Sequence, residues 1–102
     1  MGANFIDQYA YLHFAAGIIA YFWGISLTVW IILHILFELV ENTQTGIYII
    51  NRYLTFWPGG KPQPDAIINT VGDTLLAALG WISAYYLDKV GNKQRWYTLH
   101  IK

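Results

Sequence analysis

The chain contains no cysteine and few charged residues. Of its 102 residues, 12% are Asp, Glu, Lys or Arg, whereas 56% are hydrophobic and 18% are aromatic. The lack of cysteine excludes a disulfide framework and thiolate metal ligands. The formal net charge of zero removes long-range attraction to nucleic acid, so no nucleic-acid partner is expected. A water-soluble domain of this length carries about twice as much charge and cannot bury so much apolar surface. We therefore expect an integral membrane protein surrounded by lipid.

Charge is scarcest in the first apolar stretch, which is too long for one ordinary membrane span. A continuous helix over residues 7–42 would be roughly 54 Å long at about 1.5 Å per residue, whereas a bilayer core is about 30 Å thick. Gly24 can adopt the backbone conformation of a tight turn, and Ser26 can cap a following helix. The sequence therefore predicts a helical hairpin with arms at about 7–23 and 26–43. One long tilted helix is the alternative. No cleaved signal peptide is recognisable, so the first helix is expected to remain in the mature protein.

The rest of the chain predicts an interfacial connection, a third transmembrane helix and a basic tail. Aromatic residues dominate the connection at 44–64, and such rings favour the headgroup layer. The third span is expected at about 65–87, with Asp65 as its N-cap. Lysine and arginine in the tail, 88–102, favour a C-terminus on the cytoplasmic side. The predicted fold is thus one all-α domain, a small transmembrane helical bundle over 1–102.

Polar side chains end the second predicted helix and open the third. Within each set the spacing is three or four residues, so each set lies on one helical face. Polar groups in hydrocarbon are costly and usually face a protein interior or a wet cavity. Aligning the two helices antiparallel pairs Glu41 with Asp65, Glu38 with Asn69 and His34 with Asp73. The first helix adds His13 to the deepest layer. The predicted intramembrane cluster is His13, His34, Glu38, Glu41, Asn42, Asn69 and Asp73.

Three roles remain open for this cluster. Its members could hydrogen-bond one another and fix the helix register, with more effect on orientation than on stability. They could bind a ligand or lipid headgroup, with Arg52 and Lys61 holding an anion, or they could act as general acid and base. No nucleophile elbow or phosphate loop is present, which disfavours nucleophilic catalysis. The histidine and glutamate spacing differs from the Glu-x-x-His pattern of di-iron bundles, so no metal or other cofactor is expected.

Three separated motifs resemble the VanZ-like superfamily of small integral membrane proteins. They are E-L-V-E-N-T at 38–43, N-R-Y at 51–53, and the segment from Asp65 to Asp73 that includes Asn69 and Gly72. The pattern is most similar to an uncharacterised bacterial family of predicted inner-membrane proteins. The W-P-G-G-K segment at 57–61 also resembles small membrane proteins of large DNA viruses. The resemblance implies a helical membrane fold with a polar core rather than a defined activity.

The sequence thus predicts a structural or assembly component of a membrane, more readily than an enzyme. The membrane would be a bacterial inner membrane or a virion internal membrane. In a virion the chain would be a minor capsid-associated protein that contacts capsid proteins through the connection at 42–64 and the basic tail. Membrane lipids are expected partners. Small-residue seams in the helices favour contacts with protein partners or a homo-oligomer. The alternative is a VanZ-like protein that binds a lipid headgroup or phosphate, with acid/base chemistry.

Overall fold

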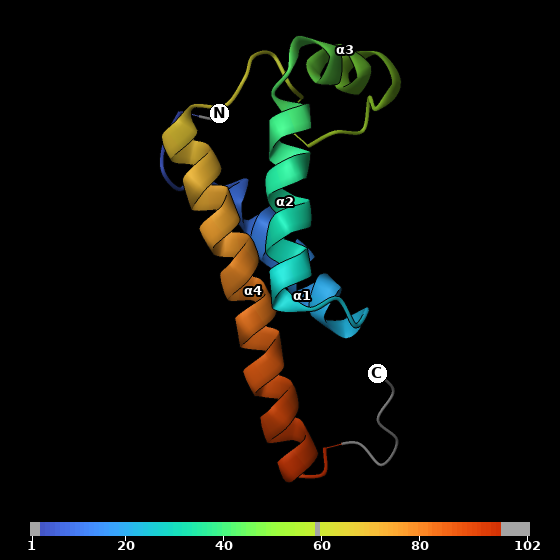
Figure 1. Cartoon of the computed structure of the whole chain (residues 1–102), viewed down its shortest axis with the longest axis vertical. Helices are drawn as coiled ribbons and strands as arrows, with labels where there is room; N and C mark the ends of the chain where they lie inside the picture. The colour runs from blue at the N-terminus through green and yellow to red at the C-terminus, as the bar shows by residue number, and fades with distance from the viewer. Residues whose placement is uncertain (1–2, 59, 97–102) are drawn as a thin grey trace.

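The computed structural model describes residues 3–58 and 60–96, and these residues form an all-helical fold (Figure 1). The helices are α1 (Ala10–Phe22), α2 (Leu27–Glu41), α3 (Gln44–Tyr53) and α4 (Ile67–Lys93). The long helix α4 forms one side of the molecule, α1 and α2 lie along its first part, and α3 lies across the end of α2. The structure therefore confirms the all-α fold class.

The first apolar stretch is broken at the predicted turn. Trp23 ends α1, and Gly24 has a φ of 82°, a conformation that side chains with a Cβ rarely adopt. Ser26 is the N-cap of α2, and its Oγ accepts a hydrogen bond of 3.2 Å from the Val29 N–H. The long tilted helix is thus excluded. The two arms are shorter than predicted, with 13 and 15 residues.

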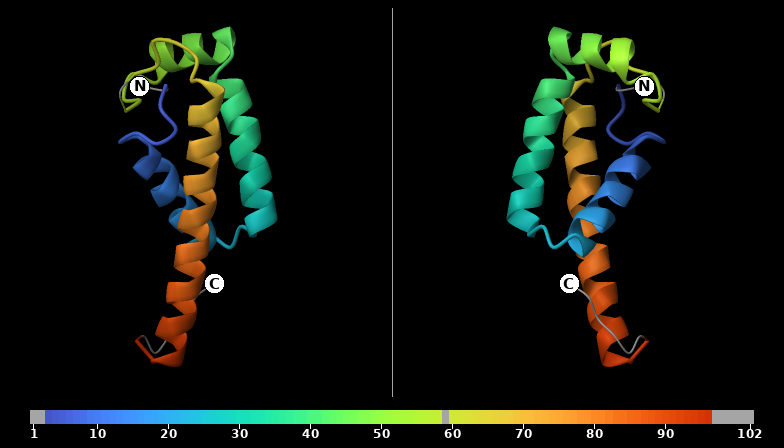
Figure 2. Two further views of the ribbon diagram at one scale, coloured as in Figure 1. Left: turned by 90° about the vertical axis from the view of Figure 1, so that its left-hand side faces the viewer. Right: turned by 90° about the vertical axis from the view of Figure 1, so that its right-hand side faces the viewer.

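Helix α1 packs against α4 rather than against α2. A Cβ placed on Gly17 would lie 2.1 Å from the Ala77 carbonyl oxygen, and one on Gly80 would lie 2.0 Å from the Phe14 carbonyl oxygen. Only glycine allows the two backbones to approach so closely. From the turn at Gly24, α1 and α2 diverge toward α3 (Figure 2). The small-residue face of α1 is therefore used for α4, and the hairpin is open rather than closely packed.

The connection and the last helix differ from expectation at their boundaries. The connection contains α3, whose N-cap Thr43 accepts a hydrogen bond of 3.0 Å from the Gly46 N–H. Asp65 is not the N-cap of α4, because Ala66 occupies that position and makes no side-chain cap. Helix α4 continues to Lys93, so the first part of the predicted tail is helical. Residues 97–102 of that tail lie outside the described residues.

The burial pattern of α2 is inverted relative to a helix of a water-soluble protein. Its three buried residues are His34, Glu38 and Glu41, whereas its exposed residues include Ile32, Leu36, Leu39 and Val40. By length and composition, α4 is the one helix of the described chain that could cross a bilayer, and α1 is apolar but shorter.

Candidate functional site: a histidine–carboxylate cavity

A cavity of about 570 Å³ lies where α1 and α2 diverge. The turns and loop that follow α3 line one side of it, and the first turns of α4 line another. Apolar side chains make up much of its wall: Leu12, Ala16, Trp30, Leu33, Phe37, Phe56 and Trp57. Its polar wall consists of Asp7, His13, His34, Glu41, Lys61, Asp65, Asn69 and Asp73. The cavity therefore combines an apolar space with ionisable groups from all three long helices.

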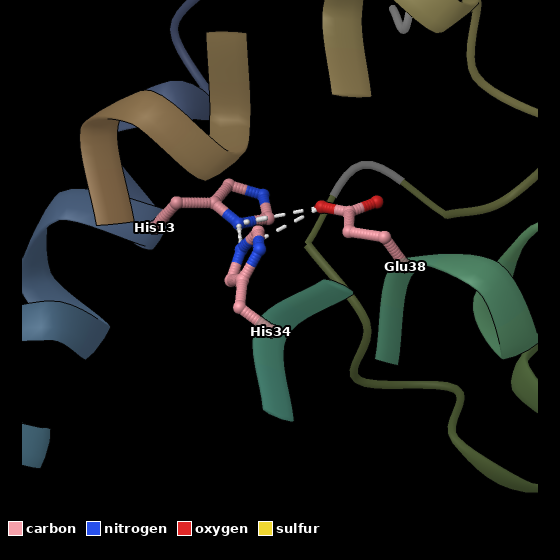
Figure 3. Close-up of side chains that lie close together, drawn as sticks. All are labelled: His13, His34 and Glu38. Carbon is pink, nitrogen blue, oxygen red and sulfur yellow. Dashed lines mark hydrogen bonds and ion pairs between the residues drawn. The ribbon is translucent and has the colours of Figure 1, made fainter. Parts of the chain in front are cut away.

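Two imidazoles of this wall meet the buried carboxylate of Glu38, which is not itself part of the wall (Figure 3). His13 Nδ1 lies 2.7 Å from His34 Nε2. Glu38 Oε1 lies 3.6 Å from His13 Nδ1 and 3.7 Å from His34 Nε2. The Glu38 side chain is 1% exposed, and its carboxylate points toward both rings. The structure thus brings together residues from α1 and α2 that are 25 positions apart at most.

The outer nitrogen of each imidazole has its own partner on α4. His13 Nε2 lies 3.2 Å from Asp73 Oδ2. His34 Nδ1 lies 3.2 Å from Thr74 Oγ1, and the Thr74 hydroxyl donates to the Thr70 carbonyl oxygen at 2.9 Å. Since its proton is used there, the Thr74 oxygen is available to His34 as an acceptor. Both rings are therefore oriented by acceptors on α4.

A second group of oxygens lies beside the first. Ligand atoms of Glu38, Glu41 and Asp65 lie within 4.8 Å of one another. Lys61 is 2% exposed, and its Nζ is 2.8 Å from Asp65 Oδ1. Glu41 and Asp65 thus converge as the antiparallel alignment predicted. The predicted anion-binding Lys61 is instead paired with a carboxylate.

Some buried carboxylate oxygens of the described cluster lack a hydrogen-bond partner. These atoms are Glu38 Oε1, Glu41 Oε1 and Asp73 Oδ1. A buried polar atom left unpaired is costly, and native structures contain few of them. The cluster is therefore not a closed hydrogen-bond network, and a ligand that supplies positive charge would satisfy it.

Two asparagines of the cluster make their shortest hydrogen bonds to main chain and longer ones, of 3.4 and 3.3 Å, to the carboxylates of Glu38 and Asp7. Asn42 Nδ2 donates to the Glu38 carbonyl oxygen at 2.8 Å, and Asn42 Oδ1 accepts from the Asp65 N–H at 2.8 Å. Asn69 Nδ2 donates to the Asn4 carbonyl oxygen at 2.7 Å and lies 3.3 Å from Asp7 Oδ2. The predicted Glu38–Asn69 layer is thus replaced by contacts of Asn69 with the N-terminal segment.

The three sequence motifs now have structural explanations. Asn51 donates to the Lys61 carbonyl oxygen at 2.8 Å and accepts from the Lys61 N–H at 3.2 Å. A Cβ on Gly72 would lie 1.8 Å from the Phe5 carbonyl oxygen, so this glycine lets the N-terminal segment cross α4. Arg52 is exposed, 6.0 Å from the Tyr53 ring, and is not part of the cavity wall. The predicted pairing of Arg52 and Lys61 around one anion does not match this placement.

Further buried polar contacts were not predicted from the sequence. Asp88 is 4% exposed and accepts a hydrogen bond from the Tyr21 hydroxyl, far along α4 from the cavity. The sequence could have indicated that Asp88 is buried, because Asp88 lies on the same helical face as Ala77, Gly80 and Ala84, which are all buried. The contribution of Thr74 had no distinct signal, since threonine is common wherever helices pack together in membranes.

The charge of the cavity wall favours a cation. Its carboxylates are Asp7, Glu41, Asp65 and Asp73, and within the described residues Lys61 is the one ammonium group among them. A phosphate oxygen would meet carboxyl oxygens rather than cationic donors along this wall. Comparisons of the chain with protein-family models, curated proteins and solved structures give no match, so they neither support nor oppose the VanZ-like resemblance.

Proposed function

We propose that the chain is an integral membrane protein whose three long helices enclose a binding site for a lipid. The inverted burial of α2 supports the membrane location, because its ionisable residues face inward and its aliphatic residues face outward. In water this arrangement would expose a large apolar surface. In lipid the same surface is favourable, and the polar residues face the protein interior.

The dimensions of the helices support a spanning α4 with a re-entrant hairpin beside it. The 27 residues of α4 extend about 40 Å, which exceeds a bilayer core of about 30 Å. Trp81 Nε1 donates to the Ile25 carbonyl oxygen at 2.7 Å, so the hairpin turn lies about 21 Å along α4 from Ile67. In this arrangement α1 and α2 enter and leave on the α3 side. Exposed Tyr48 and Tyr53 on α3 suit that interface.

The observation that carries the lipid-binding proposal is the cavity itself. It joins an apolar wall, suited to an acyl chain, to a polar wall on which buried oxygens lack partners. Ligand sites typically have this combination of apolar lining and a few convergent polar groups. Because the polar wall has an excess of carboxylates, a phosphate headgroup would need a cation bound beside them.

Filling the cavity tests this proposal. Ala16 lies on the cavity wall, whereas Ala15 on the same helix is exposed outside it. The full chain is purified in mild detergent, and retained lipids are identified by mass spectrometry. We expect the wild type and the matched control Ala15→Phe to retain a lipid, and Ala16→Phe to lose it. Equal retention by the two variants, or no retained lipid in the wild type, would contradict the proposal.

A role as an assembly component remains a second proposal, supported by the surface of the connection. Several large aromatic and apolar side chains on α3 and the residues after it are exposed: Tyr48, Ile49, Tyr53 and Phe56. Such surfaces suit protein partners. The double variant Glu38→Gln, Asp73→Asn distinguishes the roles, because an assembly component should tolerate it and a charge-dependent binding site should not. The VanZ-like relationship, the bacterial or virion membrane and the cytoplasmic C-terminus remain predictions.

A further inference from the structure

We infer that His13, His34 and Glu38 bind a divalent transition-metal ion of the Zn²⁺ type. The ligand atoms are His13 Nδ1, His34 Nε2 and Glu38 Oε1, which lie within 4.8 Å of one another. Two imidazoles and a carboxylate are a known ligand set for such ions in proteins. The sequence spacing on α2 alone did not indicate this set, because one of its members comes from α1.

The hydrogen bonds to α4 determine which nitrogens are available. When Asp73 accepts from His13 Nε2 and Thr74 accepts from His34 Nδ1, each outer nitrogen carries the ring proton. In neutral imidazoles the inner nitrogens, His13 Nδ1 and His34 Nε2, then both present lone pairs. The two inner nitrogens are 2.7 Å apart, so either one of them is protonated and donates a hydrogen bond to the other, or a cation lies between the two lone pairs.

Glu38 increases the need for a cation at this point. Its Oε1 faces both inner nitrogens, is buried, and has no hydrogen-bond partner. A buried carboxylate oxygen that has no donor and faces two ring nitrogens is unfavourable in a site of low polarity. A divalent ion bound to all three atoms replaces this arrangement by three coordinate bonds.

The distances are close to those of a metal site. Ligand atoms around a tetrahedral Zn²⁺, with bonds of about 2.0–2.1 Å, are about 3.3 Å apart. The two distances to Glu38, 3.6 and 3.7 Å, need to shorten slightly, and the nitrogens at 2.7 Å need to separate slightly. Asp73 and Thr74 would orient the rings as outer-shell partners commonly do.

Three protein ligands leave one position of a tetrahedral ion for a ligand in the cavity. His13 and His34 both line that cavity. An ion there would reverse the local charge and allow a phosphate oxygen to approach the acidic wall. This use of the ion rests on the proposed lipid site, but binding of the ion itself does not require a lipid.

The test measures metal content of the full chain without a polyhistidine tag. The background carries His100→Gln, so His13 and His34 are the remaining histidines. The protein in detergent is loaded with Zn²⁺, desalted and analysed by mass spectrometry for metal. Binding of Co²⁺ is followed by its visible absorption, which reports nitrogen ligands and tetrahedral geometry. We expect about one Zn²⁺ per chain and no displacement of Zn²⁺ by excess Mg²⁺, which prefers oxygen ligands.

Matched variants locate the ion. His34→Ala and Glu38→Gln should weaken Zn²⁺ binding at least about 100-fold, and Thr74→Ala about 10-fold through loss of ring orientation. Asp88→Asn, far along α4 from the cavity, is the matched control and should retain the ion. Glu41→Gln tests instead whether the ion lies among the neighbouring carboxylates, and it should weaken binding less than Glu38→Gln. Helical content and monodispersity in detergent show whether each variant folds. If a ligand variant misfolds, Thr74→Ala still tests the site, because it keeps all three proposed ligands. Absence of Zn²⁺ from the wild type overturns the inference. Equal loss in Glu41→Gln and Glu38→Gln also overturns it, because the ion would then lie among carboxylates.

Discussion

Gly17 of α1 lies directly against the main chain of Ala77 in α4, where a Cβ on Gly17 would be 2.1 Å from the carbonyl oxygen. The same oxygen accepts a hydrogen bond of 3.0 Å from Trp30 Nε1 of α2. Three helices therefore meet at one carbonyl group. Because His13 lies one helical turn before Gly17, this contact also sets how far α1 stands from α2 at the cavity.

Replacing Gly17 should weaken the bundle. Gly17→Ala forces α1 away from α4, and overpacking of this kind typically costs about 1–3 kcal/mol. We expect a lower thermal unfolding midpoint in detergent. Ala15→Leu adds more volume on the exposed face of the same helix and should leave the midpoint unchanged. A neutral Gly17→Ala would show that α1 and α4 are further apart than described.

Removing the Tyr21 hydroxyl should destabilise the opposite end of the bundle. This hydroxyl donates to Asp88, which is 4% exposed. Loss of a hydrogen bond to a charged buried group costs about 1.5–3 kcal/mol. Tyr21→Phe should therefore lower stability, whereas Tyr11→Phe, at a tyrosine that is 76% exposed, should not. Chemical unfolding in detergent measures the difference, and equal stability of the two variants would contradict the assigned role of Asp88.

Helical periodicity was sufficient to predict the polar cluster but not its pairing. Spacings of three and four place His34, Glu38 and Glu41 on one face, and all three are buried. The paired layers matched the second and third predicted helices by depth alone. In the structure the N-terminal segment supplies the partners of Asn69, at Asn4 and Asp7, and His34 contacts Thr74 rather than Asp73. Which side chains pair depends on how the helices cross, and the spacing of residues along one helix does not determine this.

The predicted ends of the third helix were wrong where tertiary contacts override the local sequence pattern. Asp65 follows a proline and has the side chain of an N-cap, yet its carboxylate pairs with Lys61. The end of the third helix was predicted at residue 87 because charges follow it, but Asp88 is buried against Tyr21 and the helix continues to Lys93. The turn at Gly24 was predictable because glycine and the N-cap Ser26 act locally.

The Lys61–Asp65 ion pair should stabilise the fold through the interaction of the two charges, so that removing one charge costs more than removing both. Both side chains are largely buried, and Asn51 holds the Lys61 main chain independently of its ammonium group. Lys61→Met should lower stability by about 2–3 kcal/mol because Asp65 is left without its cation. The double variant Lys61→Met, Asp65→Asn should recover much of that loss, with a coupling energy of about 1–3 kcal/mol. The control is Lys93→Met at an exposed lysine, and additive effects of the two substitutions would exclude the coupling.

Retention of a phosphate-bearing lipid should depend on the bound metal ion. With carboxylates on its wall and Lys61 already paired with Asp65, the cavity repels phosphate unless an ion sits at His13, His34 and Glu38. The measurement exposes the full chain in detergent to a phosphatidic acid and to diacylglycerol, with and without a Zn²⁺ chelator, and quantifies bound lipid by mass spectrometry. We expect chelation to lower bound phosphatidic acid at least about tenfold, which corresponds to about 1.4 kcal/mol, and to leave diacylglycerol unchanged. Glu38→Gln should reproduce the effect of the chelator, and Asp88→Asn, at a carboxylate outside the cavity, should not. Binding of phosphatidic acid that does not depend on the metal would contradict this prediction, because the cavity would then accept phosphate without the ion. The proposed metal site is tested separately, by the metal content of the protein.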